Sequence, residues 1–292
     1  MKSESNESYQ VIKPTEFRHK KIVCLTLDVE QDYGGLLDEP TYEGLEHIPQ
    51  FVNFFGERNI PLTCFIQGSL LETHPHNIRQ LATLDVEFEL HSYSHPGPRE
   101  SDAKLEIERG KEAYLKFFSK APIGYRAPLG IISERDYDVL AANGFRFDSS
   151  ILPSLRPGAF NNLRKPTKPF LINSCGIVEF PLAVFSPVIR IPIVLSYIKL
   201  LGKPYLYFMK TFNLPSLIVF CFHLHDLFQL DSASRIPPEK FSPLYRLVFN
   251  RIYQKRASNG FALLDKLIAI FQQKGYVFSK LEDVTTLLFE VK

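Results

Sequence analysis

The chain has 292 residues, of which 45% are apolar and 13% aromatic, which suits one large α/β domain or two small ones with a buried core. Its net charge of +2 and the absence of a basic block argue against nucleic-acid binding as the main activity. The four cysteines are widely spaced and form no CxxC pair, so we expect buried free thiols.

Residues 1–20 are rich in Ser, Glu and Lys and are expected to form a flexible tail. They contain no apolar segment of the kind found in a secretory signal, so we expect a cytoplasmic protein. Residues 21–292 are expected to form the folded domain.

The first predicted strand, residues 22–27, is a near-continuous apolar run that is typical of a strand buried on both faces of a parallel sheet. It is followed by three carboxylates, Asp28, Glu30 and Asp32. Carboxylates at the end of a buried strand are costly unless they are solvated, paired or bound to a cation. This segment is therefore either a polar loop or a metal and base site.

Helices and strands then alternate along the chain. Helices are expected over residues 42–57, 75–84, 101–118 and 133–143, and strands over 62–66 and 84–90. The plausible core positions of the helix over 101–118 are Leu105, Ile107, Ala113, Leu115 and Phe118.

His91 and His95 follow the strand that ends at Leu90. Neutral imidazoles are common metal ligands, and a spacing of four residues lets both face one ion. The pair alone is equally compatible with solvated or hydrogen-bonded surface histidines. Arg126 and Asp148 also follow short apolar segments, although Arg126 could pair with any surface carboxylate and Asp148 could cap a helix or turn.

Residues 153–214 interrupt this rhythm with many prolines and a basic stretch, and we expect them to form a substrate-side insertion. Within them, residues 184–201 are strongly apolar but too broken to span a membrane, which takes about twenty apolar residues. These side chains either cap the barrel or form a lid at a membrane surface. In the second case Arg190 and Lys199 would face anionic headgroups or a carrier phosphate.

The core pattern resumes in a strand over residues 217–222, which delivers His223, His225 and Asp226. A helix over 259–274, a short strand over 276–278 and a helical turn over 281–288 are expected to complete the domain.

Strands and helices that alternate at about thirty-residue intervals indicate βαβ units and hence a parallel sheet or barrel. Functional residues of such folds collect at the C-terminal ends of the strands. The polar residues at these ends are Asp28, Glu30, His91, His95, Arg126 and Asp148. We therefore expect them to form one site.

In this order, the segments resemble the motifs of the polysaccharide deacetylases, the NodB-homology or family 4 carbohydrate esterases. The five matching segments are residues 25–30, 91–95, 125–128, 147–150 and 217–226. The resemblance implies a distorted, incomplete (β/α)7 barrel. The chain departs from the family in having no tryptophan, and so lacks the aromatic residue that often follows the fourth motif.

The resemblance also implies roles for individual residues. Asp28 would be the catalytic base, oriented by Arg126 with Asp148 as the partner of that arginine. The metal ligands would be Glu30, His91 and His95. His223 would be the general acid.

Two assignments stay open at this point, because Asp32 competes with Glu30 as a ligand and His225 competes with His223 as the acid. We favour His223, since it directly ends the apolar run and forms a His-x-x-acid pattern with Asp226.

The implied activity is the metal-dependent removal of an N-acetyl group from an amino sugar in a polysaccharide or a lipid-linked saccharide precursor. Zn²⁺ is the first candidate for the metal, with Co²⁺, Ni²⁺ and Mn²⁺ as alternatives. The competing hypotheses are a metal-independent amide or ureide hydrolase on the same barrel and a non-catalytic glycan-binding relative. The expected partner is a glycan and not nucleic acid, and the lid alternative would add peripheral contact with a membrane surface or lipid carrier.

Overall fold

The computed structural model describes residues 9–12, 20–97, 102–156, 160–237 and 243–290. The helices are α1 (Glu43–Glu46), α2 (Ile48–Gly56), α3 (Leu70–Thr73), α4 (Pro75–Leu81), α5 (Ala103–Phe118), α6 (Glu134–Ala142), α7 (Leu195–Leu201), α8 (Lys203–Thr211), α9 (Leu224–Leu227), α10 (Pro243–Phe249), α11 (Gly260–Gln273) and α12 (Leu281–Glu290). The strands are β1 (Tyr9–Val11), β2 (Lys21–Val29), β3 (Leu62–Ile66), β4 (Val86–Leu90), β5 (Gly124–Tyr125), β6 (Phe147–Asp148), β7 (Leu155–Arg156), β8 (Phe160–Asn161), β9 (Phe170–Ile172), β10 (Val178–Glu179), β11 (Leu217–His223) and β12 (Tyr276–Phe278).

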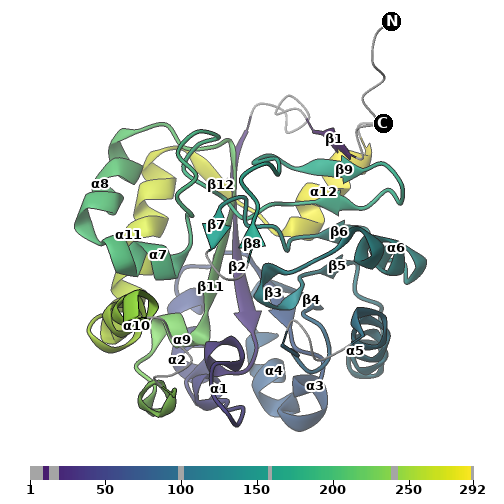
Figure 1. Ribbon diagram of the computed structural model, residues 1–292, viewed down its shortest axis with the longest axis horizontal. Helices are drawn as coiled ribbons and strands as arrows, with labels where there is room; N and C mark the ends of the chain where they lie inside the picture. Colours follow the sequence, from purple (N-terminus) through teal and green to yellow (C-terminus); the bar gives the residue numbers. More distant parts are fainter. Residues whose placement is uncertain (1–8, 13–19, 98–101, 157–159, 238–242, 291–292) are drawn as a thin grey trace, which may run out of the picture.

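A curled sheet of seven parallel strands forms the centre of the described chain, in the order β10-β6-β5-β4-β3-β2-β11 (Figure 1). Strand β12 pairs with the first residues of β2. Among the described residues β10 and β11, at the two ends of this run, are not paired as strands, although one backbone bond of 3.0 Å joins Ala183 to Val219. The predicted distorted, incomplete barrel is therefore confirmed.

The alternation of side chains along β2 divides the core into two parts. Val23, Leu25 and Leu27 face outward and pack under the surrounding helices. Ile22 and Cys24 lie in a separate interior cluster. Because successive strand residues point to opposite faces, Thr26 and Asp28 share the interior side with Cys24.

Helix α12 contributes to the barrel interior, where Leu281, Val284 and Leu288 join the interior cluster. The Glu87 carboxylate accepts hydrogen bonds from the backbone N–H groups of Leu281 and Glu282, at the start of this helix. These two N–H groups have no partner within the helix, so Glu87 satisfies them. Glu87 of β4 thus faces inward for a structural reason.

Three expectations about local structure need correction. Residues Tyr9–Val11, within the predicted tail, form β1 and pair with β9, while residues 1–8 and 13–19 of that tail lie outside the described residues. Strand β10, within the predicted insertion over 153–214, is part of the parallel barrel. Leu105 and Leu115 of α5 are 60% and 49% exposed and are not core residues.

Arg190 and Lys199, which would face a membrane surface in the lid alternative, are engaged by the protein itself. Lys199 of α7 is fully buried, and its Nζ donates to the carbonyl oxygen of Asp226 at 2.8 Å. Arg190 donates to the carbonyl oxygens of Pro153 and Lys165 at 3.2 and 2.8 Å. These contacts favour the alternative in which the segment over residues 184–201 packs on the barrel, because both cations already have partners within the protein. No helix in the described part of the chain has both the length and the apolar character needed to cross a bilayer.

Candidate metal and catalytic site

Strand β2 delivers both carboxylates of the site. Asp28 is near the end of the strand and Glu30 follows it, so the spacing of two residues places both on the interior side. They are 5% and 8% exposed, respectively. Two carboxylates this deeply buried need cationic or hydrogen-bonding partners, and each has a different set.

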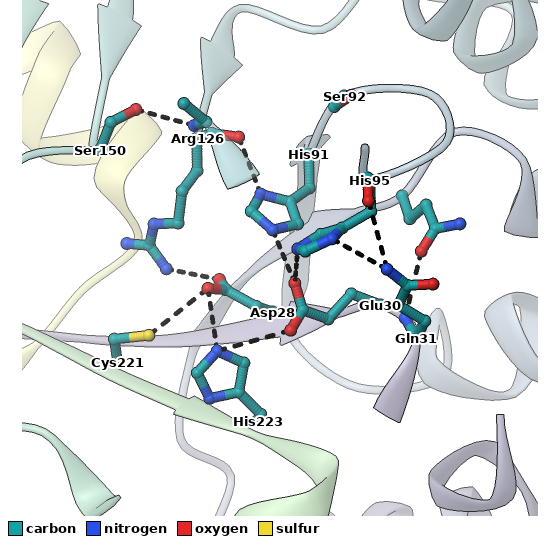
Figure 2. Close-up of polar contacts among 12 residues, drawn as sticks. Asp28, Glu30, Gln31, His91, Ser92, His95, Arg126, Ser150, Cys221 and His223 are labelled. Carbon is teal, nitrogen blue, oxygen red and sulfur yellow. Dashed lines mark hydrogen bonds and ion pairs between the residues drawn. The ribbon is translucent and has the colours of Figure 1, made fainter. Parts of the chain in front are cut away.

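The partners of Glu30 are the two histidines that follow β4, as Figure 2 shows. Glu30 Oε2 lies 2.8 Å from His91 Nε2 and 2.6 Å from His95 Nε2. Each of the three residues offers one ligand atom, and these atoms lie within 4.8 Å of one another. The histidines are 2% and 3% exposed, so this is a buried cluster rather than a surface pair.

The outer nitrogen of each imidazole has a defined neighbour. His91 Nδ1 donates to the carbonyl oxygen of Arg126 at 2.7 Å, which leaves Nε2 as the atom directed at Glu30. His95 Nδ1 lies 3.1 Å from the side-chain amide nitrogen of Gln31. The same amide nitrogen donates to the carbonyl oxygen of His95 at 3.2 Å, so Gln31 holds both the ring and the backbone of this residue.

The cluster fits a divalent metal ion. His95 Nε2 is buried and has no aligned hydrogen-bond partner among the described residues, although it lies close to Glu30. Burial opposes the ionisation of Glu30, but positive charge on His95 and the hydrogen bond from His91 hold the pKa of Glu30 well below its ordinary value. The cluster thus favours an anionic carboxylate facing positive charge, and two imidazoles with one carboxylate form a ligand set that zinc uses.

Asp28 is oriented by Arg126 rather than by the histidines. Arg126 Nη1 donates to Asp28 Oδ1 at 2.5 Å, and its Nε and Nη2 donate to the carbonyl and hydroxyl oxygens of Ser149 at 2.8 and 2.9 Å. The guanidinium also stacks over Phe65, 4.1 Å from the ring centre. One oxygen of Asp28 is thereby fixed, and Oδ2 faces Cys221 at 3.5 Å and His223 Nε2 at 3.6 Å.

His223, the last residue of β11, completes the site. Its Nε2 lies 3.8 Å from Glu30 Oε1, and its Nδ1 lies 3.0 Å from Asp226 Oδ2. The side chain is 28% exposed, far more than the other members of the site. Burial alone would lower the pKa of His223, but Asp226 and the carboxylates of β2 raise it to about 9. The imidazole is therefore a proton donor at neutral pH.

The two residues left open by the sequence lie outside this constellation. His225 Nδ1 accepts a hydrogen bond from the backbone N–H of Tyr33 at 3.2 Å, and burial lowers the pKa of His225 to about 4. Asp32 accepts hydrogen bonds from Thr41 and from the backbone N–H groups of Glu43 and Gly44, where α1 begins. The structure therefore places His223 and Glu30 at the site, and gives His225 and Asp32 structural contacts.

Asp148 is not the hydrogen-bond partner of Arg126, contrary to expectation. Phe147 belongs to the interior cluster, so the next residue of β6 faces the opposite side. There Asp148 is fully buried, accepts hydrogen bonds from Ser150 N and Oγ at 3.1 and 2.7 Å, and interacts with Glu179. Burial raises the pKa of both carboxyls, and the Asp148 charge raises that of Glu179 further.

Ser149 takes the place expected for Asp148, and the sequence did contain a signal for it. An apolar Phe147 directed into the barrel places Ser149, two residues later, on the same side. No pattern in the sequence predicted the contact between Gln31 and His95. The Gln31 amide reaches His95 because of the conformation of the loop that follows β2.

Comparison with known proteins agrees with the motifs. Residues 17–147 match the family model described as polysaccharide deacetylase. The chain is 30% identical over 129 residues to a peptidoglycan deacetylase of Helicobacter pylori, an alignment that covers 41% of this chain and 44% of that protein. The chain thus spans less than half the length of this curated relative.

Solved structures share the fold. A structure described as a putative polysaccharide deacetylase from Mycobacterium smegmatis superimposes with a TM-score of 0.58 at 18% identity, covering 93% of this chain and 91% of that one. A mutant of BA3943, described as a family 4 pseudoenzyme with restored enzymatic activity, gives a TM-score of 0.51 at 11% identity, covering 91% and 68%. The wild-type form of that protein comes from Bacillus anthracis. At these identities the likeness concerns the fold alone.

Proposed function

We propose that this chain, which belongs to the polysaccharide deacetylase family through its residues 17–147, is a metal-dependent hydrolase that removes an N-acetyl group from an amino sugar. The observation that carries the proposal is the convergence of Glu30, His91 and His95 beside the Asp28–Arg126 pair. The substrate is an N-acetylated sugar within a polysaccharide or a lipid-linked saccharide precursor, met in the cytoplasm or at the inner membrane face.

Glu30, His91 and His95 would hold the metal ion, with zinc as the first candidate. Such an ion, when bound, supplies Lewis-acid chemistry: it polarises the acyl oxygen and makes water a better nucleophile near pH 7. The nearly complete burial of the three ligands keeps bulk water away from the reacting groups.

Asp28 is the proposed base. Its Oδ1 is held by Arg126, so Oδ2 remains the oxygen that can accept a proton from the attacking water. The arginine keeps this carboxylate correctly aimed, because its charge-assisted hydrogen bond fixes Oδ1 and leaves Oδ2 directed toward His223.

His223 is the proposed acid. Breaking the C–N bond requires a proton on the nitrogen, since an amide anion is a very poor leaving group. Nε2 of His223 points into the site, and Asp226 fixes the opposite ring nitrogen. Burial lowers the pKa of His223 but the hydrogen bond to Asp226 raises it, so the imidazole can carry the proton that the leaving amine needs.

Acetate release from a panel of N-acetylated glycans, including peptidoglycan fragments and lipid-linked saccharides, tests the proposal. We expect release that is lost with a chelator and restored by zinc. Asp28→Asn should retain zinc but lose about 10²–10⁴-fold in turnover, because the ligands remain while the proton acceptor is gone. His91→Ala should lose both bound zinc and activity.

The competing functions give different results in this assay. Hydrolysis of amides or ureides that persists in the presence of chelator would indicate the metal-independent hydrolase. Glycan binding without acetate release from any member of the panel would indicate the non-catalytic relative.

A further inference from the structure

The loop between the two candidate histidine ligands is bound by one buried carboxylate on a neighbouring helix. Glu106, in the first turn of α5, accepts hydrogen bonds from Ser92 Oγ at 2.6 Å and from Ser94 Oγ at 2.8 Å. It also accepts hydrogen bonds from the backbone N–H groups of Tyr93 at 3.1 Å and Ser94 at 2.8 Å. Four donors from three consecutive residues thus converge on one side chain.

The carbonyl groups of the same loop are held from the other side. The backbone N–H groups of Gly68 and Ser69 donate to the carbonyl oxygens of Ser92 and Tyr93, both at 2.9 Å. Gly110 lets α5 come close, since a Cβ there would lie 3.0 Å from the Leu90 side chain and 3.1 Å from Ser92 O. Among the described side chains, Glu106 is therefore the one that binds the N–H side of the loop.

This loop needs holding because its backbone is strained at two positions. Ser92 and His95 have φ angles of 60° and 55°, a left-handed conformation that residues other than glycine rarely adopt. Such residues persist where the surroundings determine their conformation. Figure 2 shows the result: the chain curves between His91 and His95 so that both imidazoles face Glu30.

We propose that Glu106 is a positioning residue for the metal site, which holds residues 92–94 so that His91 and His95 reach one ion together. This inference rests on the proposed metal-dependent function. Glu106 lies one element away from the ligands and touches neither imidazole through any of its four hydrogen bonds. Its effect is therefore expected on metal affinity before catalysis.

The test measures the affinity of the full chain for Zn²⁺ by competition with a chromophoric chelator. Glu106→Gln keeps the size of the side chain but replaces one acceptor with a donor, and should weaken zinc binding by about 10–100-fold. Ser94→Ala removes one of the four bonds and should weaken it by about 2–10-fold. Glu108→Gln, at an exposed position of the same helix, should bind zinc like the wild type.

Thermal unfolding of the zinc-free proteins separates positioning from general support. Lower stability of Glu106→Gln with unchanged zinc affinity would overturn the proposal, because Glu106 would then only support the fold. If Glu106→Gln does not fold, Ser94→Ala decides, and wild-type affinity in that variant overturns the proposal. A wild-type chain that binds no zinc would instead refute the metal-dependent function, and this inference with it.

Discussion

Arg126 joins the two halves of the candidate site through different parts of one residue. Its guanidinium fixes Asp28, and its backbone carbonyl fixes the outer nitrogen of His91. The proposed base and one proposed ligand are thus held in a common frame. A lysine could not reproduce this arrangement, because the guanidinium binds Asp28, Thr26 and Ser149 at once.

The pair His223 and His225 tests the assignment of the acid. His223→Ala removes the proton donor and should lower turnover by about 10²–10⁴-fold while zinc remains bound. His225→Ala should lower stability, because that ring packs against Tyr33 at 4.8 Å and stacks on His223 at 4.7 Å between ring centres, and it should lower turnover far less than His223→Ala. Single-turnover kinetics and thermal unfolding of both variants check this. The reverse pattern would make His225 the acid.

His225 also predicts a pH dependence of stability. Burial lowers its pKa in the native state to about 4, whereas an unfolded histidine titrates near 6.5. Between these pH values the unfolded chain binds a proton that the native protein excludes. The free energy of unfolding should therefore fall, by up to about 3 kcal/mol from this group, as pH decreases from about 6.5 to 4.

Urea unfolding of the zinc-free protein across this pH range measures the effect. His225→Phe preserves an aromatic ring in the stack but cannot titrate, so its stability should fall less steeply over the same range. Carboxylates common to both proteins contribute equally to the two curves. Parallel curves would contradict a buried neutral His225.

At the scale of elements, the alternation of residues in the barrel strands decides which side chains meet. Cys24, Thr26 and Asp28 of β2 share the inner face, and Gly124 of β5 faces the ring of Phe147 of β6. Because β5 and β6 are only two residues long, the position of each strand in the sheet depends on very few side chains. Gly124 lets the two strands lie side by side, because it has no side chain that would meet the Phe147 ring.

Gly124→Ala should be strongly destabilising. An ideal Cβ at this position would overlap the ring of Phe147, a fully buried interior residue with little space to move. We expect a loss of about 3 kcal/mol in the free energy of unfolding, at the upper end of overpacking effects. Gly56→Ala, at the end of α2 with ordinary contacts, should be neutral or stabilising by up to about 1 kcal/mol. Denaturant unfolding compares the two, and equal effects would refute the argument.

The sequence predicted those features that depend on continuous patterns. The buried run before Asp28 and the five motifs in order were sufficient for the barrel and for the convergence of Glu30, His91, His95 and His223. The predicted contact between Asp148 and Arg126 was wrong, because the neighbouring strands decide which residue of a two-residue strand faces the barrel interior.

Other features could not be read from hydrophobic patterns because polar contacts override them. In α5 the loop contacts turn Glu106 inward, so Leu105 beside it is exposed. Lys199 can be buried because its ammonium group donates to a backbone carbonyl oxygen. Such a partner cannot be predicted from the residue types in the sequence. Strand β1 is recognisable only through its partner β9.

At the scale of the whole molecule, the barrel differs between its two ends. Leu281, Val284 and Leu288 of α12 fill part of the interior, whereas the proposed ligands lie where β2 and β4 end. The partly exposed His223 lies at this second end, which is therefore the side from which the proposed glycan substrate can approach. The ligands come from two strands and meet only in the folded barrel.

Zinc should consequently stabilise the native chain by mass action. At a free zinc concentration of 100 times the dissociation constant, the free energy of unfolding should rise by about 2.7 kcal/mol. Thermal unfolding with zinc and with chelator measures the difference. The double variant His91→Ala/His95→Ala should show no zinc-dependent shift, and a shift equal to that of the wild type would place the metal elsewhere.

The pairing of β2 with β11 has a consequence for synthesis on the ribosome. Asp28 of β2 and its spatial neighbour Cys221 of β11 are 193 residues apart in the sequence. At about 5–20 residues per second, β11 therefore emerges about 10–40 s after β2. Until then, β2 presents an unpaired edge along a nearly continuous apolar run. The nascent chain therefore carries this apolar strand without its partner β11 for most of its synthesis, and a chaperone that shields β2 would raise the yield of folded protein.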